Sequence, residues 1–177
     1  MQLAILERLF PSAKVICCLR NPAWIVDSTE RLIQNHAVRS PRMFPDDSFQ
    51  TVYDRAELML KAPYLGASLK GLRQAWFGEH AGMLIGVRYE SLASKPIETL
   101  SRLYELLNCV SFQHNAETVS HDEPELDDAI GLPGMHHVSA PIRLTERQTV
   151  LPPDLFKHHD NSFWDVPGQN PRGVPLL

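Results

Sequence analysis

Two short apolar runs, each leading directly into a helical pattern, constrain the fold of this chain more than any other feature. The first run is KVICCL, Lys14–Leu19, and the second lies within GMLIGVRYESL, Gly82–Leu92. Both runs carry strand-favouring apolar residues at neighbouring positions, so we expect both faces of each strand to be buried. Strands of that kind are typical of a parallel sheet covered by helices. The alternation of strands and helices therefore predicts a three-layer αβα fold of the α/β class.

Helical patterns account for much of the remaining chain. Asn21 suits an N-cap and Pro22 suits the first helical position, so we expect a helix to begin there. Two more helical segments are expected between residues 48 and 79. The stretch SKPIETLSRLYELLNC, Ser94–Cys109, predicts an amphipathic helix with a proline near its start. These helices would cover the predicted sheet.

Length and composition are those of one globular domain. The chain has 177 residues, of which 44% are hydrophobic and 21% charged, and we expect a single domain over 1–165 and a flexible tail over 166–177. A net charge of −4 argues against nucleic-acid binding through a broad basic surface. No stretch approaches the roughly 18 apolar residues of a membrane span, and no leader pattern precedes a cleavage site. The expected location is the cytoplasm.

The cysteines and histidines do not predict a metal site. Cys17, Cys18 and Cys109 have no metal-ligand spacing, and we expect them to be reduced and structural. Histidines occur as the adjacent pairs His136–His137 and His158–His159. Adjacent residues on a strand point to opposite faces, so each pair would offer a single ligand to a common site. We therefore expect no metal cofactor.

Polar residues follow both predicted strands. Arg20 comes directly after the first strand, and Arg88 and Tyr89 end the second. Ligands of open α/β sheets bind outside the carboxyl ends of the strands, and an arginine there presents a rigid fork of donors to a phosphate or sulfate. Ser28, two turns into the following helix, adds a hydroxyl donor. A capping or surface role is the alternative for Arg20 and Ser28, and a half-buried structural ring is the alternative for Tyr89.

These stretches resemble a known family. FPSAKVICCLRNPAWIVDS is similar to the 3′-phosphate-binding segment of PAPS-dependent sulfotransferases of the bacterial type, and IGVRYESLASKPIETLSRLYELLNC resembles their later strand and helix. The resemblance implies that Arg20 and Ser28 bind the 3′-phosphate and that Tyr89 lies near the adenine. The stretch MHHVSAPIRLTERQTVLPPDLFKHHDNSFW is similar to the C-terminal part of the bacterial members, where basic residues close over the 3′-phosphate, which implies binding by Arg143 and Arg147. Exposed charges without a ligand are the alternative for these two arginines.

The chain departs from the family pattern at its front. The family has a P-loop-NTPase-like fold whose first strand runs into a Gly-rich loop that holds the 5′-phosphosulfate. No such Gly-rich motif occurs in this sequence, so we expect an N-terminally truncated version of the fold. Without the central first strand, its two neighbours would expose sheet edges. That expectation points to a homo-oligomer or to a missing N-terminal segment.

The resemblance implies a sulfotransferase that uses PAPS as co-substrate and no metal. It would transfer a sulfuryl group to a hydroxyl or amine of a small-molecule, glycan or peptide acceptor, and the sequence leaves the acceptor, the oligomeric state and the catalytic base open. This chain would supply the 3′-phosphate and adenine side, with weak nucleotide binding and little catalysis on its own. The alternatives are a non-catalytic nucleotide- or partner-binding remnant of the fold, or another P-loop-like small-molecule kinase.

Overall fold

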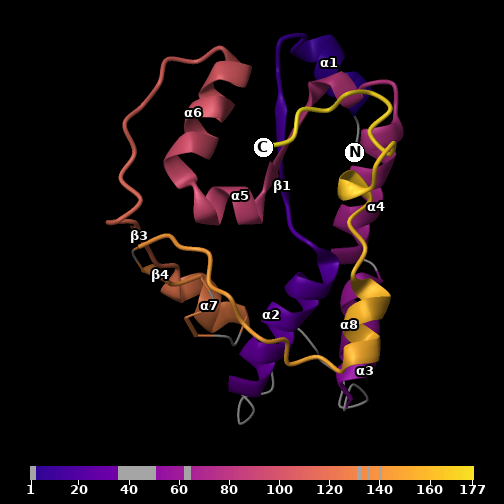
Figure 1. Cartoon of the computed structure of the whole chain (residues 1–177), viewed down its shortest axis with the longest axis vertical. Helices are drawn as coiled ribbons and strands as arrows, with labels where there is room; N and C mark the ends of the chain where they lie inside the picture. Colours follow the sequence, from indigo (N-terminus) through magenta and orange to yellow (C-terminus); the bar gives the residue numbers. More distant parts are fainter. Residues whose placement is uncertain (1–2, 36–50, 62–64, 131–132, 135, 140) are drawn as a thin grey trace. The chain divides into compact units, whose positions relative to one another are not determined.

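The computed structural model describes residues 3–35, 51–61, 65–130, 133–134, 136–139 and 141–177 (Figure 1). The chain divides into two compact units. Unit 1 comprises Met1–Arg20, Leu60–His114 and Ser162–Leu177, and unit 2 comprises Asn21–Met59 and Asn115–Asn161.

A small parallel sheet forms the centre of unit 1. Strand β1, Val15–Leu19, pairs in parallel with β2, Leu84–Arg88, in a register that sets Leu19 opposite Arg88. Both strands lie where the two apolar runs predicted them. The sheet and its helices confirm the α/β class, whereas the described strands are too few to confirm three αβα layers. The three-layer arrangement and the single domain stay predictions.

The C-terminal residues pair with the other edge of β2. The amide of Gly86 donates to the carbonyl of Pro175 at 2.8 Å, and the amide of Leu177 donates back to Gly86 at 2.9 Å. The amide of Arg88 also donates to Leu177, at 2.8 Å. The end of the chain thus differs from the flexible tail expected over 166–177. It also means that β2 has partners on both edges, so the expectation of an exposed edge was wrong for this strand.

The two strands differ in burial. Four of the five β2 residues are buried, as expected, but β1 alternates between more and less exposed positions. Ile16 is 45% exposed and Cys18 is also exposed. The expectation that both faces of β1 are covered was therefore wrong. A run of apolar residues shows that a strand is able to be buried on both faces, but the neighbouring elements decide whether it is.

The core of unit 1 forms between the sheet and residues from both ends of the chain. Helices α1, Leu3–Leu9, and α4, Leu65–Phe77, contribute to it together with the short helices η1, Ala81–Met83, and η2, Phe163–Asp165. Trp76 is fully buried and donates its indole N–H to the carbonyl of Gln169 at 2.9 Å. The other core residues are Leu3, Leu19, Ala75, Ala81, Met83, Leu84, Phe163, Trp164 and Val174.

Two helices follow β2 where the sequence predicted one. Helix α5, Tyr89–Ser94, begins directly after the strand, and α6, Pro96–Leu107, begins with its proline in the first turn. The hydroxyl of Thr99 donates to the carbonyl of Ser91 at 3.1 Å and joins the two helices. Helix α6 ends at Asn108, whose left-handed φ of 53° is one that asparagine tolerates well.

Unit 2 consists mainly of helices. Its helices are α2, Pro22–Asn35, α3, Val52–Leu60, α7, Pro124–Ile130, and α8, Pro153–His159, and a small antiparallel pair joins β3, Ser120–His121, to β4, Val138–Ser139.

The start of α2 is the one predicted, since the Asn21 side chain accepts a hydrogen bond from the amide of Ala23 at 2.9 Å. Helix α2 packs against α8, where the rings of Trp24 and Phe156 meet edge to face at 4.9 Å. Of the span expected to hold two helices, residues 48–50 and 62–64 lie outside the described part of the chain. No helix among the described residues has the length and apolar character needed to cross a bilayer.

Candidate functional site

Arg20 and Tyr89 meet at the carboxyl edge of the parallel sheet in unit 1. Because Leu19 lies opposite Arg88, the residues that follow them leave the sheet side by side. The guanidinium carbon of Arg20 lies 4.1 Å from the centre of the Tyr89 ring, which is within cation–π distance. Tyr89 is 38% exposed. The arginine charge and the aromatic face are thus held together at the edge where α/β folds bind ligands.

Arg88 has a different role from its neighbour. Its guanidinium binds Asp165, with Nε and the terminal nitrogen each 2.7 Å from the same carboxylate oxygen. Asp165 belongs to η2 near the C-terminus. This pair ties the end of β2 to the C-terminal segment, so Arg88 is a structural partner and not a candidate ligand contact.

Ser28 lies on one particular side of α2 in unit 2. At 3.6 residues per turn, Trp24, Asp27, Ser28 and Arg31 share that side of the helix. Ser28 is partly exposed, whereas Asp27 beside it is fully buried. A buried carboxylate next to the predicted phosphate-binding serine is a feature that the sequence pattern did not show.

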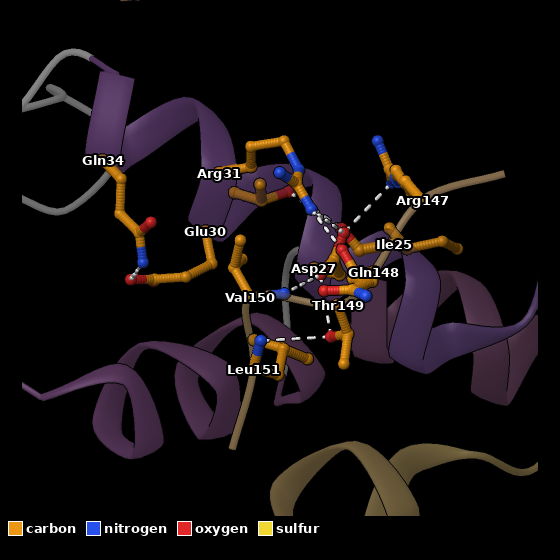
Figure 2. Close-up of polar contacts among 11 residues, drawn as sticks. Ile25, Asp27, Glu30, Arg31, Gln34, Arg147, Gln148, Thr149, Val150 and Leu151 are labelled. Carbon is orange, nitrogen blue, oxygen red and sulfur yellow. Dashed lines mark hydrogen bonds and ion pairs between the residues drawn. The ribbon is translucent and has the colours of Figure 1, made fainter. Parts of the chain in front are cut away.

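Asp27 is surrounded by groups from residues 147–150, as Figure 2 shows. One of its oxygens accepts hydrogen bonds from the Thr149 hydroxyl at 2.8 Å and from the Val150 amide at 2.7 Å. The other oxygen lies 3.2 Å from the Arg147 guanidinium and 3.6 Å from that of Arg31. A buried carboxylate needs this kind of compensation, because an unpaired one is costly to take out of water.

Arg147 lies on the face of α2 that carries Ser28. Besides its contact with Asp27, its guanidinium carbon lies 5.6 Å from the centre of the Trp24 ring, one turn before Ser28. The side chain of Arg147 is partly exposed, at 29%. The structure therefore brings two of the predicted site residues, Ser28 and Arg147, to one helix face.

Arg143 does not join this face. Its guanidinium pairs with Glu117 at 3.4 Å, and both side chains are 70% exposed. Ion pairs as exposed as this contribute little to stability. Nothing in the sequence distinguishes Arg143 from Arg147 as a candidate, but of these two arginines only Arg147 packs against the helix with Ser28.

The predicted residues thus form two pairs, one in each unit. Arg20 and Tyr89 belong to unit 1, and Ser28 and Arg147 belong to unit 2. That the two pairs converge on one phosphate group stays a prediction.

Another buried carboxylate in unit 2, that of Asp127, forms hydrogen bonds with a histidine. Asp127 on α7 is 1% exposed, and its oxygens lie 2.5 Å from Nδ1 and 3.1 Å from the backbone nitrogen of His136. Burial alone would raise the pKa of Asp127, but its hydrogen bonds with His136 outweigh that effect and lower the pKa. In the sequence His136 stands out only as half of a histidine pair, and nothing in the local pattern signals its partner nine residues earlier.

Comparison with known families gives a match over residues 1–113, to the model described as the sulfotransferase family. The matched part includes Arg20, Ser28 and Tyr89 and ends before Arg143 and Arg147. Comparison with curated proteins found no significant match, and neither did comparison with solved structures. Because the family match spans more than half of the chain and includes the strand–arginine–helix segment, this chain belongs to the sulfotransferase family.

Proposed function

We propose that the chain is the part of a PAPS-dependent sulfotransferase that binds the 3′-phosphate and the adenine of the nucleotide. Family membership supports sulfuryl transfer in general. The observation that carries the finer proposal is the contact between Arg20 and Tyr89 at the carboxyl edge of the sheet. This contact places a permanent positive charge next to an aromatic ring. A phosphorylated adenosine is bound by these two features, since the charge binds a phosphate and the ring packs against the base.

Each predicted residue has a distinct physical task in this proposal. The planar fork of Arg20 donates to phosphate oxygens and keeps its charge at any physiological pH. Tyr89, which is 38% exposed, offers an aromatic side chain for the adenine base. Ser28 and Arg147 add a hydroxyl and a second guanidinium from one face of α2. Together they would bind the nucleotide and hold it for in-line transfer.

The acceptor in this proposal is a hydroxyl or amine, and its proton is taken by a base that the sequence does not identify. The sequence contains no Gly-rich motif of the kind that holds the phosphosulfate group, which is the part that is transferred. We therefore expect nucleotide binding from this chain and little sulfuryl transfer when it acts alone. The same absence favours a second candidate function, a non-catalytic nucleotide-binding module of the same family.

Calorimetric titration with adenosine 3′,5′-bisphosphate, adenosine 5′-monophosphate and ADP tests the proposal. We expect the bisphosphate to bind most tightly, because the other two lack the 3′-phosphate. Arg20→Ala should weaken bisphosphate binding by at least about tenfold, the scale of one charge-assisted hydrogen bond. Its effect on adenosine 5′-monophosphate should be much smaller.

Arg102→Ala is the matched control, because Arg102 is an exposed arginine of α6 in the same unit and pairs only at the surface with Glu105. This variant should bind all three nucleotides as the unaltered chain does. Equal affinity of the unaltered chain for the bisphosphate and the monophosphate would refute the 3′-phosphate assignment. Tighter binding of ADP than of the bisphosphate would instead favour the small-molecule kinase alternative.

A further inference from the structure

Three neighbouring residues of one segment form hydrogen bonds with α2. The carbonyl of Gln148 accepts a bond from Arg31 at 2.8 Å, and Thr149 and Val150 both donate to Asp27. The Thr149 hydroxyl oxygen also accepts from the amide of Leu151 at 3.1 Å, which fixes the local turn of the segment. Figure 2 shows the bonds from Thr149 and Val150 to Asp27 and the bond from Leu151 to Thr149. The buried carboxylate is therefore an anchor for residues 147–151.

The anchored segment begins with Arg147, one of the predicted phosphate-binding residues. Arg147 lies 3.2 Å from the second oxygen of Asp27 and also lies against Trp24. These two contacts restrict the positions that the Arg147 guanidinium occupies. An arginine at the start of an unanchored segment would sample many positions and would lose conformational entropy on binding a ligand.

The charges around Asp27 do not cancel. Arg31 and Arg147 bring two positive charges against one carboxylate, which leaves one positive charge on this face of the helix. Both arginine side chains are about one third exposed, at 34% and 29%. The face that carries Ser28 is thus positive and partly open, as an oxyanion requires.

We infer that Asp27 is a positioning residue that holds Arg147 beside Ser28 and so sets the preference for a 3′-phosphorylated nucleotide. The inference rests on the proposed function. Asp27 acts through Arg147 and does not touch the ligand. A carboxylate close to an anion site would by its charge alone weaken anion binding, so the positioning role and the charge effect predict opposite results when Asp27 is replaced.

The test compares Asp27→Ala, Asp27→Asn and Thr149→Val by titration with adenosine 3′,5′-bisphosphate and adenosine 5′-monophosphate. Asp27→Ala should reduce the preference for the bisphosphate by roughly tenfold, the scale of one charge-assisted hydrogen bond. Asp27→Asn keeps an oxygen acceptor for the segment and should lose less. Thr149→Val removes one anchor bond without changing any charge, so a weaker preference in this variant arises from position alone. It also keeps the test decisive if Asp27→Ala does not fold.

Coupling to Arg147 is measured with a double variant. If Asp27 acts through Arg147, Asp27→Ala combined with Arg147→Ala should bind the bisphosphate no more weakly than Arg147→Ala alone. Asp128→Asn is the control, because Asp128 is an exposed acid in the same unit and should leave the preference unchanged. Tighter bisphosphate binding by Asp27→Ala would overturn the inference in favour of a charge effect. Equal weakening of both nucleotides would overturn it in favour of a general folding role.

A second measurement separates this inference from the proposed function. Hydrogen exchange at the Val150 amide should be slow in the unaltered chain and faster in Asp27→Ala, whether or not a nucleotide binds. If the unaltered chain binds no nucleotide, the proposed function fails and the ligand part of the inference fails with it. If exchange at Val150 is the same in both proteins, the anchor itself is refuted.

Discussion

Replacing Arg55 by methionine should destabilise unit 2 strongly, because it would leave a buried carboxylate without its main partner. Glu30 on α2 is 3% exposed, and Arg55 on α3 binds it with Nε at 2.8 Å and with a terminal nitrogen at 2.6 Å. The amide of Gln34 also donates to Glu30, at 3.2 Å (Figure 2). This is a two-point pair between two helices, and Arg55 is itself only 17% exposed.

The expected magnitude follows from this geometry. Removing one partner of a buried ion pair typically costs about 3–5 kcal/mol. Gln34 still donates to the carboxylate in Arg55→Met, so we expect the lower end of that range, about 3 kcal/mol. Glu30→Gln keeps an acceptor for Arg55, which is less deeply buried, and should cost about 1–2 kcal/mol. Replacing both residues by methionine should come close to the stability of the unaltered chain, since an apolar pair of similar volume often substitutes for a buried ion pair.

Urea unfolding followed by far-ultraviolet circular dichroism measures these differences. With a typical slope of about 1–3 kcal/mol per molar urea, Arg55→Met should lower the midpoint by roughly 1–3 M. Lys95→Met is the control, because Lys95 pairs only at the surface with Glu98 and both side chains are more than 60% exposed. A loss below about 1 kcal/mol in Arg55→Met, equal to that of an exposed pair, would refute the reasoning.

Three further changes test other parts of the structure. Asp127→Asn should be less stable than the unaltered chain at neutral pH, and the difference in stability should shrink as the pH falls toward about 3. The reason is that the hydrogen bonds from His136 lower the pKa of Asp127, and their benefit is lost once Asp127 is protonated. Urea midpoints across that pH range measure the difference, and a difference that stays constant would contradict the prediction. Gly86→Ala should lower the free energy of unfolding, measured by thermal unfolding, by about 1–3 kcal/mol, because a methyl group at this position would lie 2.7 Å from Leu176 and 2.8 Å from Leu19. Full stability of this variant would show that the C-terminal residues do not pack there. The hydrogen bond to Asp154 raises the pKa of Tyr53, so Asp154→Asn should move one tyrosine to a lower titration midpoint in alkaline absorbance, and this shift should be absent when Tyr53→Phe is also present.

Much of unit 1 follows from local sequence patterns. The strands at Val15–Leu19 and Leu84–Arg88 lie where the apolar runs predicted them, and Pro96 starts a helix as its position indicated. The meeting of Arg20 and Tyr89 also follows, because residues after two adjacent parallel strands leave the sheet at the same edge. Each of these features depends on a period or a motif of a few residues, which the sequence displays directly.

The burial of β1 and the course of the C-terminus did not follow from the sequence. An apolar strand has the same sequence pattern whether a helix, another strand or water lies beside it, so the pattern did not predict the exposure of Ile16. The last residues show only a Pro- and Gly-containing composition, and their pairing with Gly86 joins positions about ninety residues apart. Contacts over such separations depend on the path of the whole chain.

The sequence by itself determined which residue types stand at the sheet edge and on α2, and the family resemblance predicts a ligand for them. Only the tertiary structure distinguished Arg147 from Arg143, two arginines four positions apart in the same kind of segment. It did so by burying Asp27 and placing Thr149, 122 positions later, against it. The physical reason is that a carboxylate has to find compensating partners once it is buried, and folding alone decides which distant groups lie close enough to provide them.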